Sequence, residues 1–205
     1  MMIRFLCLMM ICLMFCGCGK VNMTFNSNTA APKDFNPNDP LILRRIIFVN
    51  GCFNEAMARS VCTELVYLDS QSKTKPITMC INSGGGDLMA FLAIRNMINS
   101  ISAPVDTVNM GFSGSAAVLL YLSATGKRYC IKDSSFGIHE PTGNPKEHRK
   151  HYVELQENLL RTKCELPEDW LPIKSRQFFV NDNDAKKYKI CDEIIEKIEF
   201  SVYDF

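Results

Sequence analysis

The chain has 205 residues, of which 47% are hydrophobic and 22% are charged, a composition typical of a folded globular domain. Its 23 Lys and Arg residues nearly balance its 22 Asp and Glu residues, which gives a net charge of +1. No block of like charge stands out, so the sequence gives no support for nucleic acid as a partner. Once a short leader is removed, the remainder suits one domain with one sizeable core.

The N-terminal residues have the pattern of an export signal. Residues 1–17 carry a single charge, Arg4, which is followed by an apolar run from Phe5 to Phe15. At about 1.5 Å per residue, this run is too short to cross a bilayer of roughly 30 Å comfortably. A charged start before a short apolar segment is typical of a secretory signal peptide.

Cys18 is the expected lipidation site. Gly17 precedes it, as a small residue does in bacterial lipoprotein signals, although Phe15 and Cys16 stand where Leu and a small residue are usual. We therefore predict a signal peptide over residues 1–18 and an exported protein that a lipid on Cys18 anchors to the membrane. The alternatives are an uncleaved signal anchor or a misassigned start codon, and the alternative location is the cytoplasm.

The rest of the chain divides into a tether and a domain. Residues 19–40 are polar and rich in Asn, Thr and Pro, a composition that cannot bury enough apolar surface to fold, so the domain is predicted over residues 41–205. Its cysteines form no C-x-x-C pair, so we expect no metal site, and nothing indicates a cofactor. Cys80 and Cys130 lie in apolar strand-like runs, where a buried free thiol is the commoner state, and no disulfide is predicted.

The domain alternates short apolar strands with helices. Strands are predicted from β-branched and apolar runs, and helices from apolar residues at helical spacing. The expected strands are residues 46–49, 76–81, 104–108, 128–131 and 136–139, and the expected helices are residues 54–70, 87–100, 116–124 and 145–163. Asn50-Gly51 is predicted to end the first strand in a turn. This alternation over short loops implies an α/β domain with largely parallel strands.

Two loops of small residues each join a predicted strand to a predicted helix. One contains Gly84-Gly85-Gly86, and the other runs from Ser113 to Ala117. Backbone N–H groups at a helix start lack partners within the helix, so such a loop can hold the oxyanion of a hydrolase or a phosphate group. The triple glycine is neither a G-x-G-x-x-G motif nor a P-loop, and taken alone it is more often a flexible tight turn.

Ser115 in the second loop is a candidate nucleophile, because a hydroxyl at a strand-to-helix junction can be exposed. A serine needs a base to accept its proton. His148 and His151 lie in the charged run KEHRKH and are expected on a solvated helix face, with a weak metal pair as the alternative. His139 instead ends an apolar strand, although a lone histidine at such a place is more often structural than catalytic.

The segments INSGGGDLMAFLAIRNMINSISAPVDTVNMGFSGSAAVLL and GKRYCIKDSSFGIHEPTG closely resemble the proteolytic subunit of the Clp protease family. Members of this family have an INSPGG loop, a GQAASMG nucleophile loop and a GKR strand before IHQP. The likeness covers about residues 41–195 and is densest over residues 81–143. It implies an α/β fold, the spiral of ββα units shared by the Clp protease and crotonase families, with a helical handle and assembly into a homo-oligomeric ring.

The resemblance also assigns roles to residues by position. It implies that Ser115 is the nucleophile and His139 the general base, while the N–H groups of Gly86 and Ala116 form the oxyanion hole. Ser113 is a rival nucleophile by chemistry, but the alignment favours Ser115.

Gln177 stands where the family has the aspartate of the catalytic triad. An amide can orient the imidazole ring but has no charge to stabilise imidazolium, and the analogous exchange in a Ser-His-Asp triad costs about 10⁴ in turnover. Asp182 or Asp184 could supply the acid if the loop shifts. A slow peptidase, a peptidase with a relocated acid and an inactive pseudoenzyme therefore stay open.

Three further differences from the family concern the backbone and the assembly. Gly84 replaces a proline, which is expected to loosen the oxyanion loop, and Lys189 replaces a turn glycine, which adds strain if φ is positive there. The stretch between His139 and Gln177 is shorter than usual, so the helical handle is shortened and stacking of two rings is not expected.

The predicted function is that of a Clp-like serine endopeptidase that cleaves peptides or unfolded proteins. One alternative is a non-catalytic structural or regulatory subunit, which Gln177 favours. Another is a crotonase-type acyl-CoA enzyme, against which the pairing of Ser115 with His139 argues. An ATP-dependent unfoldase is an expected partner only for a cytoplasmic protein, because an exported one would have no such ATPase beside it.

Overall fold

A mostly parallel sheet of seven strands forms the framework of the structure, a computed structural model that describes residues 35–140, 146–171, 173 and 177–198. The predicted signal peptide, its lipidation site Cys18 and the tether up to residue 34 lie outside the described residues. Phe35, near the end of the predicted tether, packs its ring on Tyr67 with 5.0 Å between the ring centroids. Within the described ranges, none of the helices combines the length and the apolar character that a membrane crossing requires.

The strands follow the spatial order β1-β2-β3-β4-β7, and all of these neighbours are parallel. β5 lies parallel to β3 and antiparallel to β6. The strands are β1 (Ile46–Phe53), β2 (Ile77–Gly86), β3 (Val105–Gly114), β4 (Arg128–Ile131), β5 (Ser135–His139), β6 (Gln177–Asn181) and β7 (Glu193–Ile195). The helices are α1 (Pro40–Leu43), α2 (Glu55–Gln71), α3 (Leu88–Ser100), α4 (Ala116–Leu122), α5 (Lys146–Lys163) and α6 (Asp182–Lys187).

β3 has two successive neighbours. Its first half pairs with β4 from Thr107 to Asn109, and its second half pairs with β5 from Phe112 to Gly114. At the end of the first section, the Asn109 side chain donates a hydrogen bond to the carbonyl of Ser135, at the start of β5 (2.9 Å). The carboxyl ends of β2, β3 and β5 therefore meet at one edge of the sheet, the kind of place where ligands bind in open parallel sheets.

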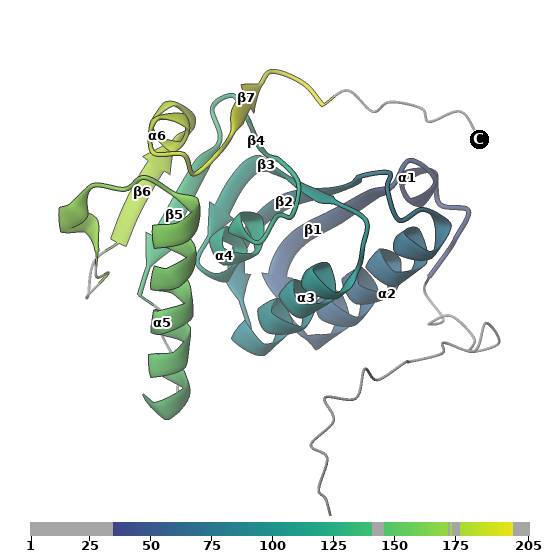
Figure 1. Cartoon of the computed structure of the whole chain (residues 1–205), viewed down its shortest axis with the longest axis horizontal. Coiled ribbons are helices and arrows are strands. Elements are labelled where there is room, and N and C mark those ends of the chain that lie inside the picture. Colours follow the sequence, from purple (N-terminus) through teal and green to yellow (C-terminus); the bar gives the residue numbers. More distant parts are fainter. Residues whose placement is uncertain (1–34, 141–145, 172, 174–176, 199–205) are drawn as a thin grey trace, which may run out of the picture. The chain divides into compact units, whose positions relative to one another are not determined.

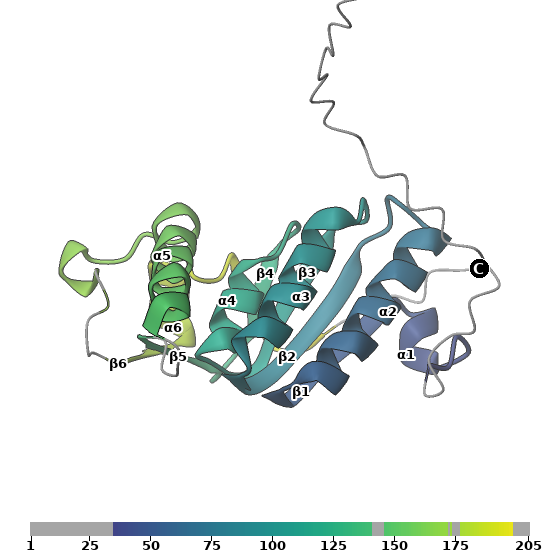
Figure 2. The same cartoon turned by 90° about the horizontal axis from the view of Figure 1, so that it is seen from below.

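Helices α2, α3 and α4 cover one face of the sheet, and α5 lies beside α4 (Figures 1 and 2). Every residue of α4 is buried, so this helix is a core element rather than an amphipathic surface helix. A second, smaller apolar cluster contains the buried residues Ile46, Cys80 and Val108. Strands that bury side chains on both faces read as continuous apolar runs, which explains why the sequence pattern located β1, β2 and β3.

The predicted elements are present, and several strands are longer than expected. The turn predicted at Asn50-Gly51 is wrong, because β1 continues to Phe53 through a register shift between Asn50 and Cys52. The positive φ of Gly51 (82°) permits this irregularity. The triple glycine likewise is not a separate turn but the end of β2. β6, α6 and β7 were not among the predicted elements, since they are short and weakly patterned.

The helix expected in the handle region and the strain expected at residue 189 are both present, while the shortened handle and the absence of ring stacking stay predictions. The helix predicted over residues 145–163 is α5, which buries Leu159 and Leu160 in the main core. Lys189 has a φ of 53°, in the left-handed region where a side chain costs about 1 kcal/mol or more. The lysine therefore sits where glycine would be unstrained.

Asp69 ties α2 to the loop that precedes β3 and gives a test of the fold. Its carboxylate accepts hydrogen bonds from the N–H groups of Ser102 and Ala103 (both 2.9 Å) and pairs with Lys73. We expect Asp69→Ala to lower the free energy of unfolding by about 1–3 kcal/mol, because two backbone donors, of which that of Ala103 is buried, lose their acceptor. Urea unfolding at neutral pH measures this, and Glu154→Ala, at an exposed pair on α5, should change it by less than about 0.5 kcal/mol.

The stabilisation of the fold by the Asp69 carboxylate should depend on pH. Burial acts to raise the pKa of Asp69, but the hydrogen bonds from Lys73 and the two backbone N–H groups outweigh burial and hold this pKa below its usual range. A lowered carboxyl pKa means that the stabilisation is present above about pH 4 and is lost as the pH falls through the pKa of the folded state. An equal effect of Asp69→Ala at neutral pH and in acid would contradict this.

Candidate active site

Ser115 lies at the junction between β3 and α4 in a strained backbone conformation. Its φ of 53° and ψ of −124° fall where residues other than glycine are rare. Its N–H group donates to the carbonyl of Gly137 in β5 (2.8 Å), which holds the junction against the neighbouring strand. Ser115 is half-buried, whereas its rival Ser113 is fully buried, so Ser115 carries the more accessible of the two hydroxyls. Ala116 follows as the first residue of α4, where N–H groups lack partners within the helix.

The glycine segment at the end of β2 lies directly against this junction. Gly85 has a φ of +91°, and a Cβ atom there would lie 2.7 Å from the carbonyl oxygen of Gly114 and 2.8 Å from the backbone nitrogen of Ala116. Both contacts would be with backbone atoms, which cannot rotate away as a side chain can. Residue 85 must therefore be glycine for the two loops to approach so closely.

The two backbone N–H groups on either side of Gly86 already have acceptors. Gly85 donates its N–H to Ser83 Oγ (2.9 Å), so that donor is already used. Asp87 donates to the carbonyl of Phe53 in β1 (3.1 Å). Gly86 follows at the end of β2 with a φ of +140° and pairs with Phe53 of β1. Since Gly86 ends β2 and Ala116 begins the helix after β3, the two residues of the predicted oxyanion hole lie at the carboxyl ends of neighbouring parallel strands.

His139 ends β5 beside the same junction. Gly114 pairs with Gly137 in the parallel ladder of β3 and β5, so the residues that follow them emerge together at the carboxyl edge. His139 is half-buried, like Ser115. Within the described part of the chain, no hydrogen bond joins its ring to Ser115; in enzymes without substrate such contacts are often long and tighten on binding.

The comparisons with known proteins identify the family and the fold. The family model described as Clp protease matches residues 31–198.

The chain belongs to the Clp protease family.

Among solved structures, an Asn-to-Asp mutant of ClpP1 from Listeria monocytogenes is similar in fold, with a TM-score of 0.66. The two sequences are 33% identical, and the match covers 77% of this chain and 94% of that chain. The α/β fold predicted from the resemblance to the Clp family is therefore confirmed.

The ring of His139 is oriented by a backbone carbonyl. Its Nδ1 atom lies 2.7 Å from the carbonyl oxygen of Glu140. A carbonyl oxygen can only accept a hydrogen bond, so this contact requires the proton on Nδ1 and leaves the lone pair on Nε2. This is the tautomer that a general base facing a serine needs.

Helix α5 holds the segment that carries this histidine. Gln156 donates a hydrogen bond from Nε2 to the carbonyl of His139 (2.9 Å), and Arg149 pairs with the carboxylate of Glu140 (2.9 Å). Gln156 is 2% exposed, and its Oε1 atom is buried without a hydrogen-bond partner among the described residues. The sequence analysis missed Gln156; the signal was a polar residue within the apolar stripe that includes Tyr152 and Leu159.

Gln177 lies beside His139, where the family resemblance puts the third member of the triad. The two residues are direct partners in the antiparallel ladder of β5 and β6. The Gln177 side chain is exposed, and between these two described residues there is no hydrogen bond. The neutral amide of Gln177 therefore does not orient the imidazole ring, which the carbonyl of Glu140 does instead.

Neither alternative acid lies near His139. Asn181 pairs with Ser135 at the far end of the two strands, so Asp182 begins about 13 Å of strand away from the histidine. The Asp182 carboxylate accepts a hydrogen bond from the N–H group of Asp133 (2.9 Å), and Asp184 lies further along α6. The possibility of a relocated acid at Asp182 or Asp184 is therefore not supported by the fold.

Of the two other histidines, only His151 has a described side chain. His151 is exposed on α5 and contacts the ring of Tyr152, as expected for a solvated helix face, while the side chain of His148 lies outside the described residues. Among the residues that the structure describes, no group of three or more His, Cys, Asp and Glu side chains is suited to hold a metal ion.

The contact of Gly85 with the Ser115 junction can be tested with a neighbouring control. We expect Gly85→Ala to lower the melting temperature by roughly 5–10 °C, because the new Cβ meets backbone atoms and the φ of +91° is strained. Gly84→Ala is the matched control, since a Cβ there meets nothing within 4 Å. Thermal unfolding of both variants measures the difference, and equal melting temperatures would show that the two loops do not meet as described.

Proposed function

We propose that the protein is a serine endopeptidase that uses Ser115 and His139 as a catalytic dyad. The observation that supports this most is the placement of the two residues at the carboxyl ends of adjacent parallel strands, with the histidine in the tautomer of a base. Membership of the Clp protease family supports the same chemistry.

The proposed reaction begins when the Nε2 atom of His139 takes the proton of the Ser115 hydroxyl. The Ser115 Oγ atom then attacks the carbonyl carbon of the peptide, and the N–H groups of Gly86 and Ala116 donate hydrogen bonds to the oxyanion that forms. Each such donor is worth about 3 kcal/mol in transition-state stabilisation. His139 returns the proton to the leaving amine, which leaves an acyl-enzyme on Ser115. Water activated by the same histidine hydrolyses that ester and restores the free enzyme.

The group that accepts a hydrogen bond from the His139 ring is neutral, and this determines the turnover that we expect. The carbonyl of Glu140 orients the ring but carries no full charge to stabilise the imidazolium that forms during the reaction. By analogy with an amide in place of the triad aspartate, turnover should be about 10⁴ lower than in a complete triad. We therefore propose slow cleavage of peptides or unfolded chains.

The assembly and location of the enzyme are part of the proposal. We propose a homo-oligomeric ring, as for other members of the family, and export as a lipoprotein anchored through Cys18. In that location no ATP-driven unfoldase would deliver folded substrates, so only peptides and already unfolded proteins would reach Ser115. A cytoplasmic location would make such an ATPase a possible partner.

A second function, that of a non-catalytic structural or regulatory subunit, is favoured by one specific observation. Gln177 stands beside His139 but is neutral and, among the described residues, makes no hydrogen bond to its ring, so no carboxylate supports the base at this position. The crotonase-type alternative has no such support, because the family match is to the Clp protease.

Covalent labelling with a fluorophosphonate probe distinguishes these two functions. We expect the wild-type chain to be labelled on Ser115, Ser115→Ala to be unlabelled, and His139→Ala to be labelled at least 100-fold more slowly. Ser113→Ala is the matched control and should keep the wild-type labelling rate, because that hydroxyl is fully buried. Intact mass and peptide mapping measure the outcome. Absence of labelling in the wild type at every pH would contradict the proposed peptidase activity and favour the non-catalytic subunit.

A further inference from the structure

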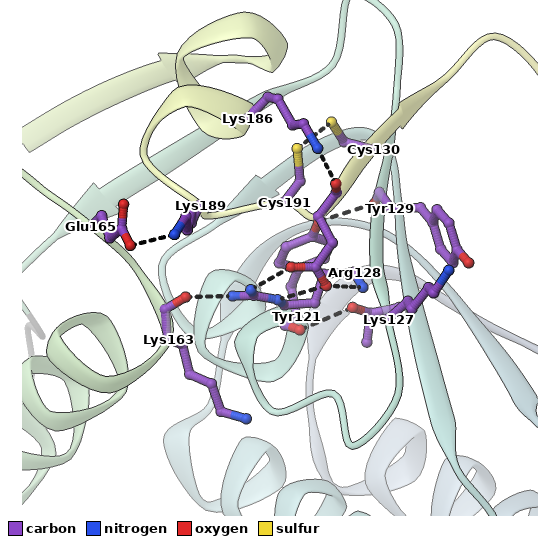
Figure 3. Close-up of polar contacts among 12 residues, drawn as sticks. Tyr121, Lys127, Arg128, Tyr129, Cys130, Lys163, Glu165, Lys186, Lys189 and Cys191 are labelled. Atoms are coloured by element: carbon purple, nitrogen blue, oxygen red, sulfur yellow. Dashed lines mark hydrogen bonds and ion pairs between the residues drawn. The ribbon is translucent and has the colours of Figure 1, made fainter.

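Two buried cysteines that come from distant parts of the chain face each other. Cys130 lies in β4, and Cys191 lies two residues before β7. Their Sγ atoms are 3.2 Å apart, and both residues are at most 1% exposed (Figure 3). A disulfide bond has an S–S length of about 2.05 Å, so the two sulfur atoms need to approach by only about 1.2 Å.

The backbone next to this thiol pair is fixed on both strands. The N–H group of Asp192 donates to the carbonyl of Arg128 (2.7 Å), and the N–H group of Arg128 donates to the Asp192 carboxylate (2.8 Å). The Arg128 guanidinium also pairs with Asp192 (2.6 Å) and donates to the carbonyl of Lys163 (2.8 Å), so β4, α5 and the start of β7 are joined around the sulfur atoms. The thiols therefore meet as part of the native packing rather than by a chance approach of loops.

The surroundings also distinguish the two thiols, one of which must ionise to begin disulfide exchange. The Lys186 side chain donates to the carbonyl of Asp192 and lies beside the two sulfur atoms (Figure 3). The hydrogen bond between the two thiols lowers the pKa of Cys130 and, together with burial, raises the pKa of Cys191. Cys130 is thus the better nucleophile of the two, since the thiolate is the attacking species.

We propose that Cys130 and Cys191 form an intramolecular disulfide during folding, before both thiols are buried, by exchange with a low-molecular-weight disulfide such as oxidised glutathione. The Cys130 thiolate attacks one sulfur atom of the small disulfide, which forms a mixed disulfide and releases one thiolate. The Cys191 thiolate then attacks the Cys130 sulfur atom, which forms the Cys130–Cys191 bond and releases the second thiolate. The two cysteines lose two electrons and two protons in total, and the small disulfide is reduced to two thiols.

The bond would close a loop that contains His139 but not Ser115, Gly86 or Ala116. His139, α5, Gln177 and α6 all lie between Cys130 and Cys191. Such a cross-link stabilises mainly by restricting the unfolded chain, and the effect grows with the length of the loop that it closes. The proposal is independent of the peptidase activity, because it rests on the distance between the thiols and not on Ser115.

Refolding of the full chain in glutathione buffers tests the proposal. The reduced, unfolded chain is refolded at a series of ratios of oxidised to reduced glutathione, free thiols are alkylated, and the peptides are mapped by mass spectrometry. We expect a Cys130–Cys191 linked peptide in oxidising buffer, with both cysteines alkylated in reducing buffer. The oxidised protein should melt roughly 5–10 °C higher than the reduced protein.

Two kinds of variant complete the test. Cys191→Ser and Cys191→Ala should each abolish the linked peptide and the rise in melting temperature, so that a folding defect specific to one substitution does not decide the outcome. Cys62→Ser, at a half-buried cysteine in α2, should keep both. Alkylation of Cys130 and Cys191 at every glutathione ratio in correctly folded protein, or their linkage to other cysteines instead, would overturn the proposal.

Discussion

The division of β3 between two neighbours is the constraint on which the candidate site depends. β4 pairs with the first half of β3 and β5 with the second half, so β5 pairs with β3 beyond the point where the pairing of β4 with β3 has ended. This arrangement carries His139 to the same edge as Ser115, although the two residues lie on different strands. The Asn109 side chain holds the start of β5 at the branch. On the other side of β3, Gly85 allows the end of β2 to approach the Ser115 junction to backbone contact.

The chemistry of the site follows from how each group is held. Ser115 is strained and is fixed by Gly137, and His139 is held through its own carbonyl by Gln156. Holding these groups in place costs stability. Here the costs are the positive φ of Ser115 and the buried Oε1 atom of Gln156, which has no hydrogen-bond partner among the described residues. What differs from a full triad is the charge behind the histidine. A backbone carbonyl fixes the tautomer as well as a carboxylate does, but it stabilises the imidazolium far less.

The sequence predicted the candidate site residues where they stand within a recognisable local motif. Ser115, His139 and the glycine segment stand at strand ends, and an ordered series of motifs places them in the Clp family without knowledge of the fold. The turn at Asn50-Gly51 was mispredicted because its dipeptide is typical of turns, whereas the pairing of β1 with β2 continues through it. A tertiary contact overrode a local preference there.

The residues that the sequence did not indicate act through contacts between distant segments. Gln156 looks like an interruption of an apolar helix face until α5 is seen beside β5, and Cys130 and Cys191 are ordinary buried cysteines until β4 meets the start of β7. β6 is short and pairs antiparallel to β5, so neither its register nor the position of Gln177 beside His139 could be derived from periodicity. Such features depend on the fold as a whole.

A crystal structure of the protein after reaction with a fluorophosphonate would test the central claim most directly. The proposed dyad predicts phosphorus bonded to the Ser115 Oγ atom, with a phosphonyl oxygen within about 3 Å of the N–H groups of Gly86 and Ala116. It also predicts that the His139 Nδ1 atom keeps the carbonyl of Glu140 as its acceptor, as it does here at 2.7 Å. A His139 ring turned to a carboxylate, or a phosphonyl group on any residue other than Ser115, would contradict it.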